Sequence, residues 1–477
     1  MGSFSTSAIH LLLTFFLFHS CFHQSAANTQ NNRETLEIII GGGSPAPPPE
    51  IEYWSPPLPP PPECPPPPPP PRPPPPPPPP PPSPPPPPPP SPPPPPKPPS
   101  PLPIELRMAI KVIKRFKRRI TSDPLHITDT WKGNGICKDK SAYKGFICGS
   151  REDKRLRVAG VKFNGYKLAG NPLNFTDFIE DLKDLVFFHV NSNNFSGQLP
   201  VEISKIQYFY ELDLSNNKLK GAFPYEVLTA TNLTFLDLRF NQLTGTVPPM
   251  VFKMDLDVLF LNNNKFYGPI PDNLGNTPVL YLTLANNQFD GPIPKSIGNA
   301  SNTLLEVLFL NNRLSGCLPY EIGLLKKNRV FDASKNQLTG PIPHSFGCLA
   351  KMEQLNLSSN MLFGPVPETL CKLKNLYKLA LADNYFTQLG PECRKLVKRN
   401  VLSVTKNCVL DLPSQRSAAE CSAFFSEHRR CPDQRSLNYV PCDIDDQFAS
   451  HEPSDLEPMP SIAPSPSPSY AALIENR

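Results

Sequence analysis

One short motif recurs through the middle of the chain at a nearly constant spacing. Residues 236–248 read LDLRFNQLTGTVP, in which leucines alternate with polar residues before an asparagine, a glycine and a proline. Successive asparagines of the aligned copies are 23 to 25 residues apart, and an irregular first copy, VKFNGYKLAGNP, has Tyr166 at that position. The other nine copies are centred on Asn193, Asn217, Asn241, Asn264, Asn287, Asn312, Asn336, Asn360 and Asn384.

A period of this length with the pattern L-x-x-L-x-L-x-x-N-x-L is the signature of leucine-rich repeats. We predict an α/β solenoid, in which ten plant-type leucine-rich repeats form a curved right-handed superhelix with disulfide caps. The leucines of each short strand should point into the core, and the strands should form a parallel sheet along the inner face. Each asparagine should hydrogen-bond the backbone of neighbouring turns. Because Asn312 comes one residue early in our alignment, we expect a local irregularity there.

The region before the repeats divides into a leader and a proline-rich tract. Residues 1–27 are expected to be a secretory signal peptide, because the apolar run LLLTFFLF is too short to span a bilayer and precedes small residues. Residues 28–103 form a proline-rich region, and residues 56–103 should adopt a polyproline II rod. This rod is either a stiff spacer or a hydroxylated, glycosylated tract for attachment to a cell wall. Since no other window resembles a membrane span, we expect a secreted, extracellular protein.

Caps should close both ends of the solenoid, because terminal repeats expose their core. Residues 104–157 form the N-terminal cap. Its segment 104–120 has helical apolar spacing, and we favour an end-capping helix over a basic helix lying on a membrane. The repeats should occupy 158–390, a cysteine-rich C-terminal cap 391–442, and a disordered tail 443–477.

The twelve cysteines fit an oxidising compartment. Cys137 and Cys148 should form one disulfide, and Cys371 could join the five cap cysteines, whose pairing the sequence does not determine. With Cys21 lost in the leader an odd number remains, so either Cys64 or a cap cysteine is left over. A free Cys64 could form an intermolecular disulfide and give a homodimer. The five cap cysteines are Cys393, Cys408, Cys421, Cys431 and Cys442, and N-glycosylation sequons start at Asn174, Asn194, Asn232, Asn299 and Asn356.

The residues between the inward leucines should form the inner face of the sheet. Aromatic side chains there are expected to make an exposed apolar stripe surrounded by acids, which suits a basic peptide through anchoring and charge steering. In the competing interpretation the aromatics pack sideways on one another, and Arg239 pairs with a neighbouring acid. The candidate peptide-binding residues are Phe187, His189, Tyr210, Glu211, Asp213, Phe235, Asp237, Asp257, Phe260, Tyr281, Glu306 and Phe309.

Other function classes find little support. Asp213 and Asp237 lie one repeat apart, as paired carboxylates of a glycosidase could, but they belong to a repeating column without a deep pocket. His189 has no cysteine or histidine at metal-ligand spacing. We therefore predict no enzyme, no metal and no cofactor. The formal charge of +5 is mild, and aromatic residues do not interleave with basic ones as in nucleic-acid binders, so we expect no nucleic-acid partner.

Several segments between residues 123 and 442 resemble the plant leucine-rich repeat extensin-like family, among them LVFFHVNSNNFSGQLP, LSGCLPYEIGLLKK and KNCVLDLPSQRSAAECSAFF. The resemblance implies a cell-wall protein that binds small basic cysteine-rich peptides of the rapid alkalinisation factor type and ties signalling to wall expansion. Pectin is a further expected partner. The chain departs from the family in one respect, because its proline-rich tract precedes the repeats and lacks cross-linking tyrosines. Two alternative functions are an inhibitor of microbial wall-degrading enzymes and a structural wall glycoprotein.

Overall fold

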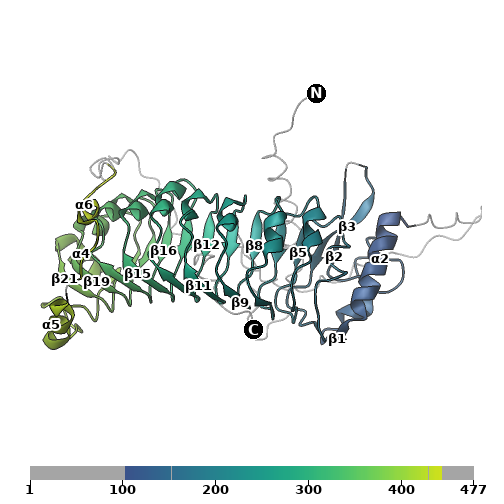
Figure 1. Cartoon of the computed structure of the whole chain (residues 1–477), viewed down its shortest axis with the longest axis horizontal. Helices are drawn as coiled ribbons and strands as arrows, with labels where there is room; N and C mark the ends of the chain where they lie inside the picture. The colour runs from purple at the N-terminus through teal and green to yellow at the C-terminus, as the bar shows by residue number, and fades with distance from the viewer. Residues whose placement is uncertain (1–101, 152, 428, 443–477) are drawn as a thin grey trace, which may run out of the picture. The chain divides into compact units, whose positions relative to one another are not determined.

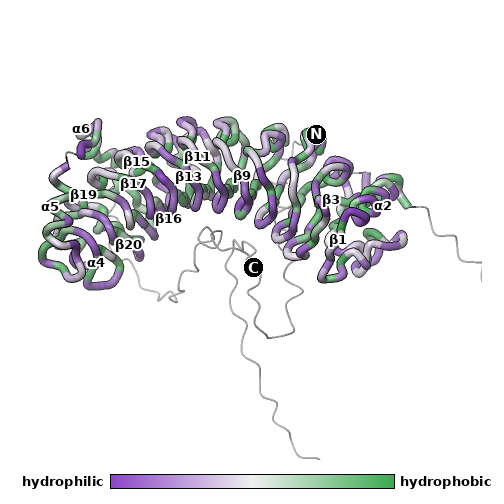
Figure 2. Tube along the Cα trace, turned by 60° about the horizontal axis from the view of Figure 1, so that its bottom comes forward, coloured by the Kyte–Doolittle hydropathy of each residue, from purple (hydrophilic) through white to green (hydrophobic). Residues whose placement is uncertain are grey.

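The computed structural model describes residues 102–442 except residues 152 and 428. The expected signal peptide, the proline-rich tract with Cys64 and the C-terminal tail lie outside the described residues, so the predictions made for them stay predictions. Within the described part, the predicted solenoid is confirmed: successive turns stack side by side and form an arc (Figures 1 and 2).

Each turn of the solenoid contributes a short strand to one long sheet on the concave side. Twelve strands form this sheet, and all neighbours are parallel except β2 and β3. The inward residues of these strands, such as Leu212 and Leu236, are fully buried in the core. In spatial order the strands are β2 (Phe146–Ser150), β3 (Leu156–Lys162), β5 (Phe187–His189), β6 (Glu211–Asp213), β8 (Phe235–Asp237), β10 (Val258–Phe260), β12 (Tyr281–Thr283), β14 (Glu306–Leu308), β16 (Val330–Asp332), β18 (Gln354–Asn356), β20 (Lys378–Ala380) and β22 (Leu402–Ser403).

A second parallel sheet of eight strands runs along the solenoid, and each of its strands follows the repeated asparagine of its turn. It consists of β7 (Lys220–Gly221), β9 (Gln242–Gly245), β11 (Lys265–Pro269), β13 (Gln288–Gly291), β15 (Arg313–Cys317), β17 (Gln337–Gly340), β19 (Met361–Val366) and β21 (Tyr385–Leu389). Short helices then lead each turn back to the concave sheet, namely η2 (Val201–Lys205), η3 (Tyr225–Thr229), η4 (Pro249–Lys253), η5 (Leu274–Asn276), η6 (Lys295–Ala300), η7 (Tyr320–Leu324), η8 (His344–Cys348) and α3 (Glu368–Cys371).

The repeated asparagines form a buried hydrogen-bond ladder. Oδ1 of Asn241 accepts from the backbone N–H of Leu219 at 3.0 Å, and its Nδ2 donates to the carbonyl of Leu214 at 2.9 Å. Both partners lie on the preceding turn, so each asparagine satisfies backbone groups that stacking removes from water. The ladder continues to Asn407, which bonds Phe386 N–H at 2.9 Å. An additional partial turn, which contains β22 and Asn407, therefore lies inside residues 391–442, the segment predicted to be the C-terminal cap.

The N-terminal cap is built around helix α2 (Ile104–Lys117), which packs against strand β3 (Figure 1). Its apolar face is buried, and Phe116 stacks on Phe178 with ring centroids 3.7 Å apart. The helix therefore lies where the end-capping interpretation puts it, against the first strands of the solenoid. The cap also holds η1 (Ile127–Thr130), a two-stranded ribbon of β1 (Ile120–Ser122) with β4 (Ala169–Gly170), and the disulfide between Cys137 and Cys148.

The C-terminal cap contains α4 (Pro391–Lys398), α5 (Ala418–Ser426) and α6 (Gln434–Leu437), and disulfides fasten it to the repeats. Two bonds are local, Cys371–Cys393 and Cys408–Cys421. The other two join the end of the cap to cysteines deep in the repeats, Cys317–Cys431 and Cys348–Cys442. All ten cysteines in the described part of the chain are paired, so the idea that a cap cysteine is left over is wrong, and an intermolecular role for Cys64 stays a prediction.

Candidate functional site

The concave sheet presents its outward residues in straight columns, because neighbouring strands pair in register. From β3 to β20 the central column reads Lys162, His189, Asp213, Asp237, Phe260, Thr283, Leu308, Asp332, Asn356 and Ala380. The preceding column reads Gly160, Phe187, Glu211, Phe235, Val258, Tyr281, Glu306, Val330, Gln354 and Lys378.

The prediction that Phe309 lies on the inner face, in strand β14, was wrong. Leu308, not Phe309, lies between Thr283 and Asp332 in the central column. Phe309 points into the core and is fully buried. The spacing from Val307 through Phe309 to Asn312 matches that of the other repeats, so the expected irregularity at Asn312 does not exist: its Oδ1 accepts from Phe289 N–H at 3.0 Å, as the ladder requires.

The predicted exposed aromatic stripe is also corrected. The ring of Phe187 lies over Gly160, where a Cβ would come within 2.2 Å of the ring, and only 5% of Phe187 is exposed. Phe260 is 1% exposed because Val258 and its aromatic neighbours pack against it. Sideways packing therefore describes these two residues correctly. Phe235 and Tyr281 remain partly exposed on the concave wall.

Several acids of the candidate site are used by the fold. Asp213 is buried and accepts from Asn191 Nδ2 at 2.8 Å and from the backbone N–H of Ser215 at 2.9 Å. Asp237 and Glu306 are buried as well. These three side chains lie beneath the surface and cannot contact a ligand directly. They are therefore not part of the predicted acidic rim.

Accessible acids do lie beside the two partly exposed aromatic rings. Glu211 neighbours Phe235 in the preceding column, and its side chain is 27% exposed. Asp257 precedes strand β10 and is exposed, and Tyr210, which precedes β6, is half-buried. These side chains and the two rings lie on or directly before strands β6 to β12, the fourth to seventh strands of the concave sheet, so the accessible part of the predicted site lies near the middle of that sheet.

His189 extends this accessible region toward the N-terminal cap. Its Nε2 lies 2.9 Å from Oε2 of Glu211, and its ring contacts those of Phe187 and Phe235 at centroid distances of 5.0 and 6.2 Å. Burial lowers the pKa of His189, but the hydrogen bond and charge of Glu211, together with the charge of Asp213, outweigh burial and raise it above the ordinary value. The imidazolium form is thus favoured beside Glu211.

Asp237 lies at the centre of the charged network. Burial, reinforced by the charge of Asp213, raises the pKa of Asp237 to about 7, although Arg239 opposes the shift. Arg239 Nε lies 2.9 Å from Oδ2 of Asp237. The expected pairing of Arg239 with a neighbouring acid is therefore present. A carboxyl group in this position can change its charge near neutral pH.

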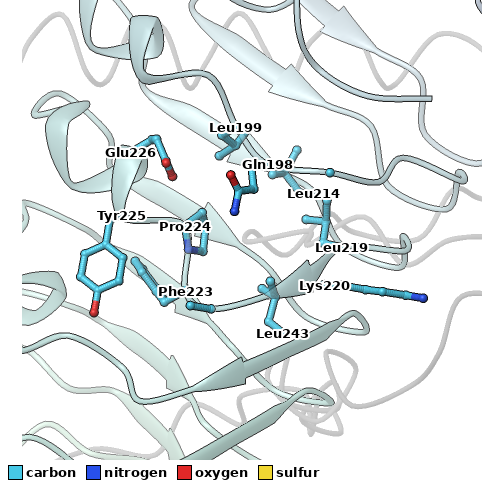
Figure 3. A pocket seen from close by; sticks show the side chains of 12 residues that line it. Gln198, Leu199, Leu214, Leu219, Lys220, Phe223, Pro224, Tyr225, Glu226 and Leu243 are labelled. Atoms are coloured by element: carbon cyan, nitrogen blue, oxygen red, sulfur yellow. The ribbon is translucent and has the colours of Figure 1, made fainter. Parts of the chain in front are cut away.

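Two further features of the described surface bear on function, metal-ligand clusters and hollows. The described residues contain no cluster of three or more histidine, cysteine or acidic side chains that could hold a metal ion. A small hollow opens between the turns near η3 (Figure 3). It is lined by Leu219, Phe223, Tyr225 and Leu243, together with Lys220 and Glu226, and by none of the candidate peptide-binding residues.

Comparison with known proteins identifies the repeats and their wider context. The Leucine Rich Repeat family profile matches residues 232–254 and 351–373. Leucine-rich repeat extensin-like protein 7 of Arabidopsis thaliana is 52% identical over 330 residues, which cover 69% of this chain and 74% of that protein. The chain belongs to the leucine-rich repeat extensin-like family. Extensin-like protein 6 of the same plant is 45% identical and is covered over 67% of its length, whereas only 21% of extensin-like protein 1 is matched, at 47% identity.

Solved structures share the solenoid fold of this extensin-like protein. The ectodomain of the Arabidopsis thaliana receptor kinase GASSHO1/SCHENGEN3, in complex with CASPARIAN STRIP INTEGRITY FACTOR 2, matches with a TM-score of 0.50 and 24% identity, over 64% of this chain and 39% of that one. A plant ice-binding protein matches with a TM-score of 0.51 and 24% identity, over 65% of this chain and 98% of that one. Among the described residues, no helix is long and apolar enough to cross a membrane.

The five sequons of this extensin-like protein occupy different surroundings. Asn232 and Asn299 are exposed. Asn174 and Asn194 are partly buried, and Asn174 Oδ1 accepts a hydrogen bond from Arg119. Asn356 lies in the concave sheet, where its Nδ2 donates to Asp332 at 2.9 Å. We expect the exposed Asn232 and Asn299 to be the favoured acceptors because of their exposure, since Nδ2 of Asn232 also donates a hydrogen bond, to the carbonyl of Gln207 at 2.7 Å.

Proposed function

We propose that this protein is a secreted, wall-associated binding protein that captures a small basic, cysteine-rich peptide of the rapid alkalinisation factor type. The observation that carries the proposal is the pair of partly exposed rings, Phe235 and Tyr281, with the accessible acids Glu211 and Asp257 beside them. The binding surface includes these four residues with His189 and half-buried Tyr210.

The two rings and the two acids have different roles in this proposal. Aromatic side chains supply large contact area at little cost in conformational entropy and are frequent hot spots of interfaces. Accessible carboxylates accelerate the approach of a cationic partner and fix its orientation. The buried residues Phe187, Phe260 and Asp237 lie beneath this surface and hold its geometry, so the ligand need not touch them.

Family membership supports the wall location and the peptide ligand, because the resemblance to extensin-like proteins implies both. Five disulfides within the described residues suit an oxidising extracellular compartment. The geometry also favours binding over catalysis. Asp213 and Asp237 are close in the sheet, but Asn191, Ser215 and Arg239 already occupy their oxygens, so neither is poised for proton transfer to a substrate.

A matched pair of charge reversals tests the proposed surface. Asp257→Lys changes the concave wall, whereas Asp290→Lys makes the same change at an exposed position of β13 in the second sheet. We expect Asp257→Lys to weaken binding of a cationic cysteine-rich peptide by about tenfold, mostly at low salt, and Asp290→Lys to leave it unchanged. Isothermal titration calorimetry at two salt concentrations measures the effect, and equal losses in both variants would contradict the proposal.

A second substitution tests the aromatic anchor. Phe235→Ala should weaken the same peptide by roughly 2 kcal/mol, or about thirtyfold, with little change in salt dependence. Tyr267→Ala is the control, because Tyr267 is an exposed aromatic residue of the second sheet. If neither variant alters peptide capture while the protein inhibits a fungal polygalacturonase, the inhibitor function replaces the present proposal.

A further inference from the structure

Positive charge is concentrated at one end of this protein. Residues 104–157, the N-terminal cap, contain 15 Lys and Arg against 6 Asp and Glu, whereas the whole chain contains 47 against 42. The rest of the chain is therefore slightly acidic. A separation of charge of this kind creates a local field that attracts an anionic partner to the cap.

Helix α2 carries much of this charge and is held firmly against the solenoid. Leu106, Ile110, Ile113 and Phe116 on its apolar face are buried. Three basic residues, two in the helix and one just after it, also anchor it to the fold, each through bonds to a different segment. Arg115 pairs with Asp181, Lys117 donates to the carbonyl of Thr128, and Arg119 donates to the carbonyl of Asn174 at 2.7 Å.

Four other basic residues of this segment lie on the opposite side, in single file. Arg107, Lys111, Lys114 and Arg118 are all exposed, and their spacing of three or four residues places them on one face of the helix. At a rise of 1.5 Å per residue, the row extends over about 16 Å. Within the described part of the chain, no ion pair or side-chain hydrogen bond engages any of the four. The fold therefore uses the inner cations and leaves this row available to solvent.

We propose that the row Arg107–Lys111–Lys114–Arg118 is a docking site for an extended polysaccharide that carries carboxylates along its length. A linear polyanion matches a single row of cations, because it can place successive charges beside successive side chains and release counterions as it binds. The choice of a wall polysaccharide as this polyanion rests on the proposed wall location, whereas the need for repeated negative charge follows from the row itself. This site is distinct from the concave peptide surface and has the opposite charge.

Two other occupants fit the row less well. A helix that binds in a membrane interface inserts its apolar face, but the apolar face of α2 is buried in the cap, and only Ile104 and Met108 are exposed at its start. A specific protein partner would require an apolar contact core, which a row of four cations does not provide. A polysaccharide needs neither feature.

The test uses the full secreted chain and polygalacturonate as the probe. Lys111→Glu/Lys114→Glu reverses two charges of the row, and Lys218→Glu/Lys265→Glu makes the same change at exposed positions along the second sheet. We expect the row variant to bind at least about tenfold more weakly, with a shallower dependence of log affinity on log salt concentration. The control variant should match the unmodified protein.

Three outcomes would overturn the proposal. These are equal weakening in both double variants, undiminished binding in the row variant, and equally tight binding of fully methyl-esterified polygalacturonate, which lacks the charge. A fourth arm uses phosphatidylserine vesicles: if the row variant loses vesicles but retains polygalacturonate, the occupant is a membrane. Unfolding midpoints confirm that both variants are folded. Peptide binding should be unchanged in the row variant, so failure here is distinguishable from failure of the proposed peptide function.

Discussion

Arg239 pairs with Asp237 on the concave sheet, where Nε lies 2.9 Å from Oδ2 and the carboxyl group is almost completely shielded from solvent. The guanidinium also lies over the ring of Phe260, with its central carbon 5.3 Å from the centroid. The pair therefore joins the charged and aromatic parts of the face. The neighbouring strands are followed by smaller polar residues at the position of Arg239, namely Ser215 and Asn262.

Removing one partner of this pair should cost more stability than removing both. Arg239→Ala leaves the buried carboxyl group of Asp237 without its cation. Because the pKa of Asp237 is already about 7, this group can take up a proton at little cost, and we expect the free energy of unfolding to fall by only about 1 kcal/mol at pH 7.5. The double variant Asp237→Asn/Arg239→Ala should recover part of this loss, because no charge is then buried. Urea unfolding at pH 7.5 measures all three proteins. Equal stability of the single and double variants would show that the arginine acts mainly by packing.

The stability of the solenoid should decrease as the pH rises from 5 to 7.5. The pKa of Asp237 is about 7 in the folded protein against an ordinary value near 4, so the folded state holds a proton that the unfolded state has released. Stability is then greatest at acidic pH and is lost as the pH rises through 7. His189 acts in the same direction, because its raised pKa stabilises the folded state below the unfolded value, and this contribution disappears above the folded one.

Thermal unfolding across this pH range provides the test, with Asp237→Asn as the decisive variant. It removes one titrating group, so its unfolding temperature should vary less with pH than that of the unmodified protein. Asp290→Asn, at an exposed position, should keep the full pH dependence. Carboxyl groups with lowered pKa values, such as Asp411 beside Arg394, are ionised throughout this range and do not contribute. An unchanged slope in Asp237→Asn would assign the dependence to His189.

The architecture could be predicted well from the sequence because an asparagine recurs at the same place in successive repeats. Each ladder asparagine positions a strand, and the candidate residues of the inner face were placed on the correct side of every strand but one. The error at β14 arose from aligning Phe309 with the strand positions of its neighbours although Asn312 indicated a different register. The partial turn at β22 also had a signal, since Leu402, Val404 and Asn407 repeat the same spacing.

Exposure on the concave face was harder to predict, because it depends on residues in adjacent turns. Phe187 is covered only because Gly160 on the neighbouring strand leaves room for the ring to lie flat. Phe260 is covered by contacts from β8 and β12. The long-range disulfides depend on where the end of the cap folds back, and a sequence separation of 114 residues for Cys317–Cys431 gives no hint of their proximity.

The asparagine ladder should contribute strongly to stability at each position. Asn241→Ala removes an acceptor for Leu219 N–H and a donor to Leu214, which leaves buried backbone groups unsatisfied. We expect a loss of about 2–4 kcal/mol in the free energy of unfolding. Asn276→Ala, at an exposed position of η5, should change it by less than about 0.5 kcal/mol. Hydrogen exchange at Leu219 would locate the effect, and continued protection of that amide would contradict it.

Gly340 should be required for the disulfide that holds the end of the C-terminal cap. It has a φ of +83°, and a Cβ at this position would come within 2.3 Å of Cys431 Sγ and 3.0 Å of Cys317 Sγ. Gly340→Ala should therefore combine backbone strain with a collision against the bond. We expect a lower unfolding temperature and a smaller fraction of molecules with Cys317–Cys431 intact, as measured by peptide mapping without reduction.

Gly221→Ala separates these two causes. Gly221 has a φ of +95° at the equivalent position of β7, but a Cβ there would meet nothing within 4 Å. Its variant should show the cost of the left-handed backbone alone, about 1 kcal/mol, with all disulfides formed. The difference between the two variants measures the collision, which the close approach of Cys431 predicts to be the larger part. Equal destabilisation and equal disulfide content would mean that the cap shifts to accommodate the added carbon.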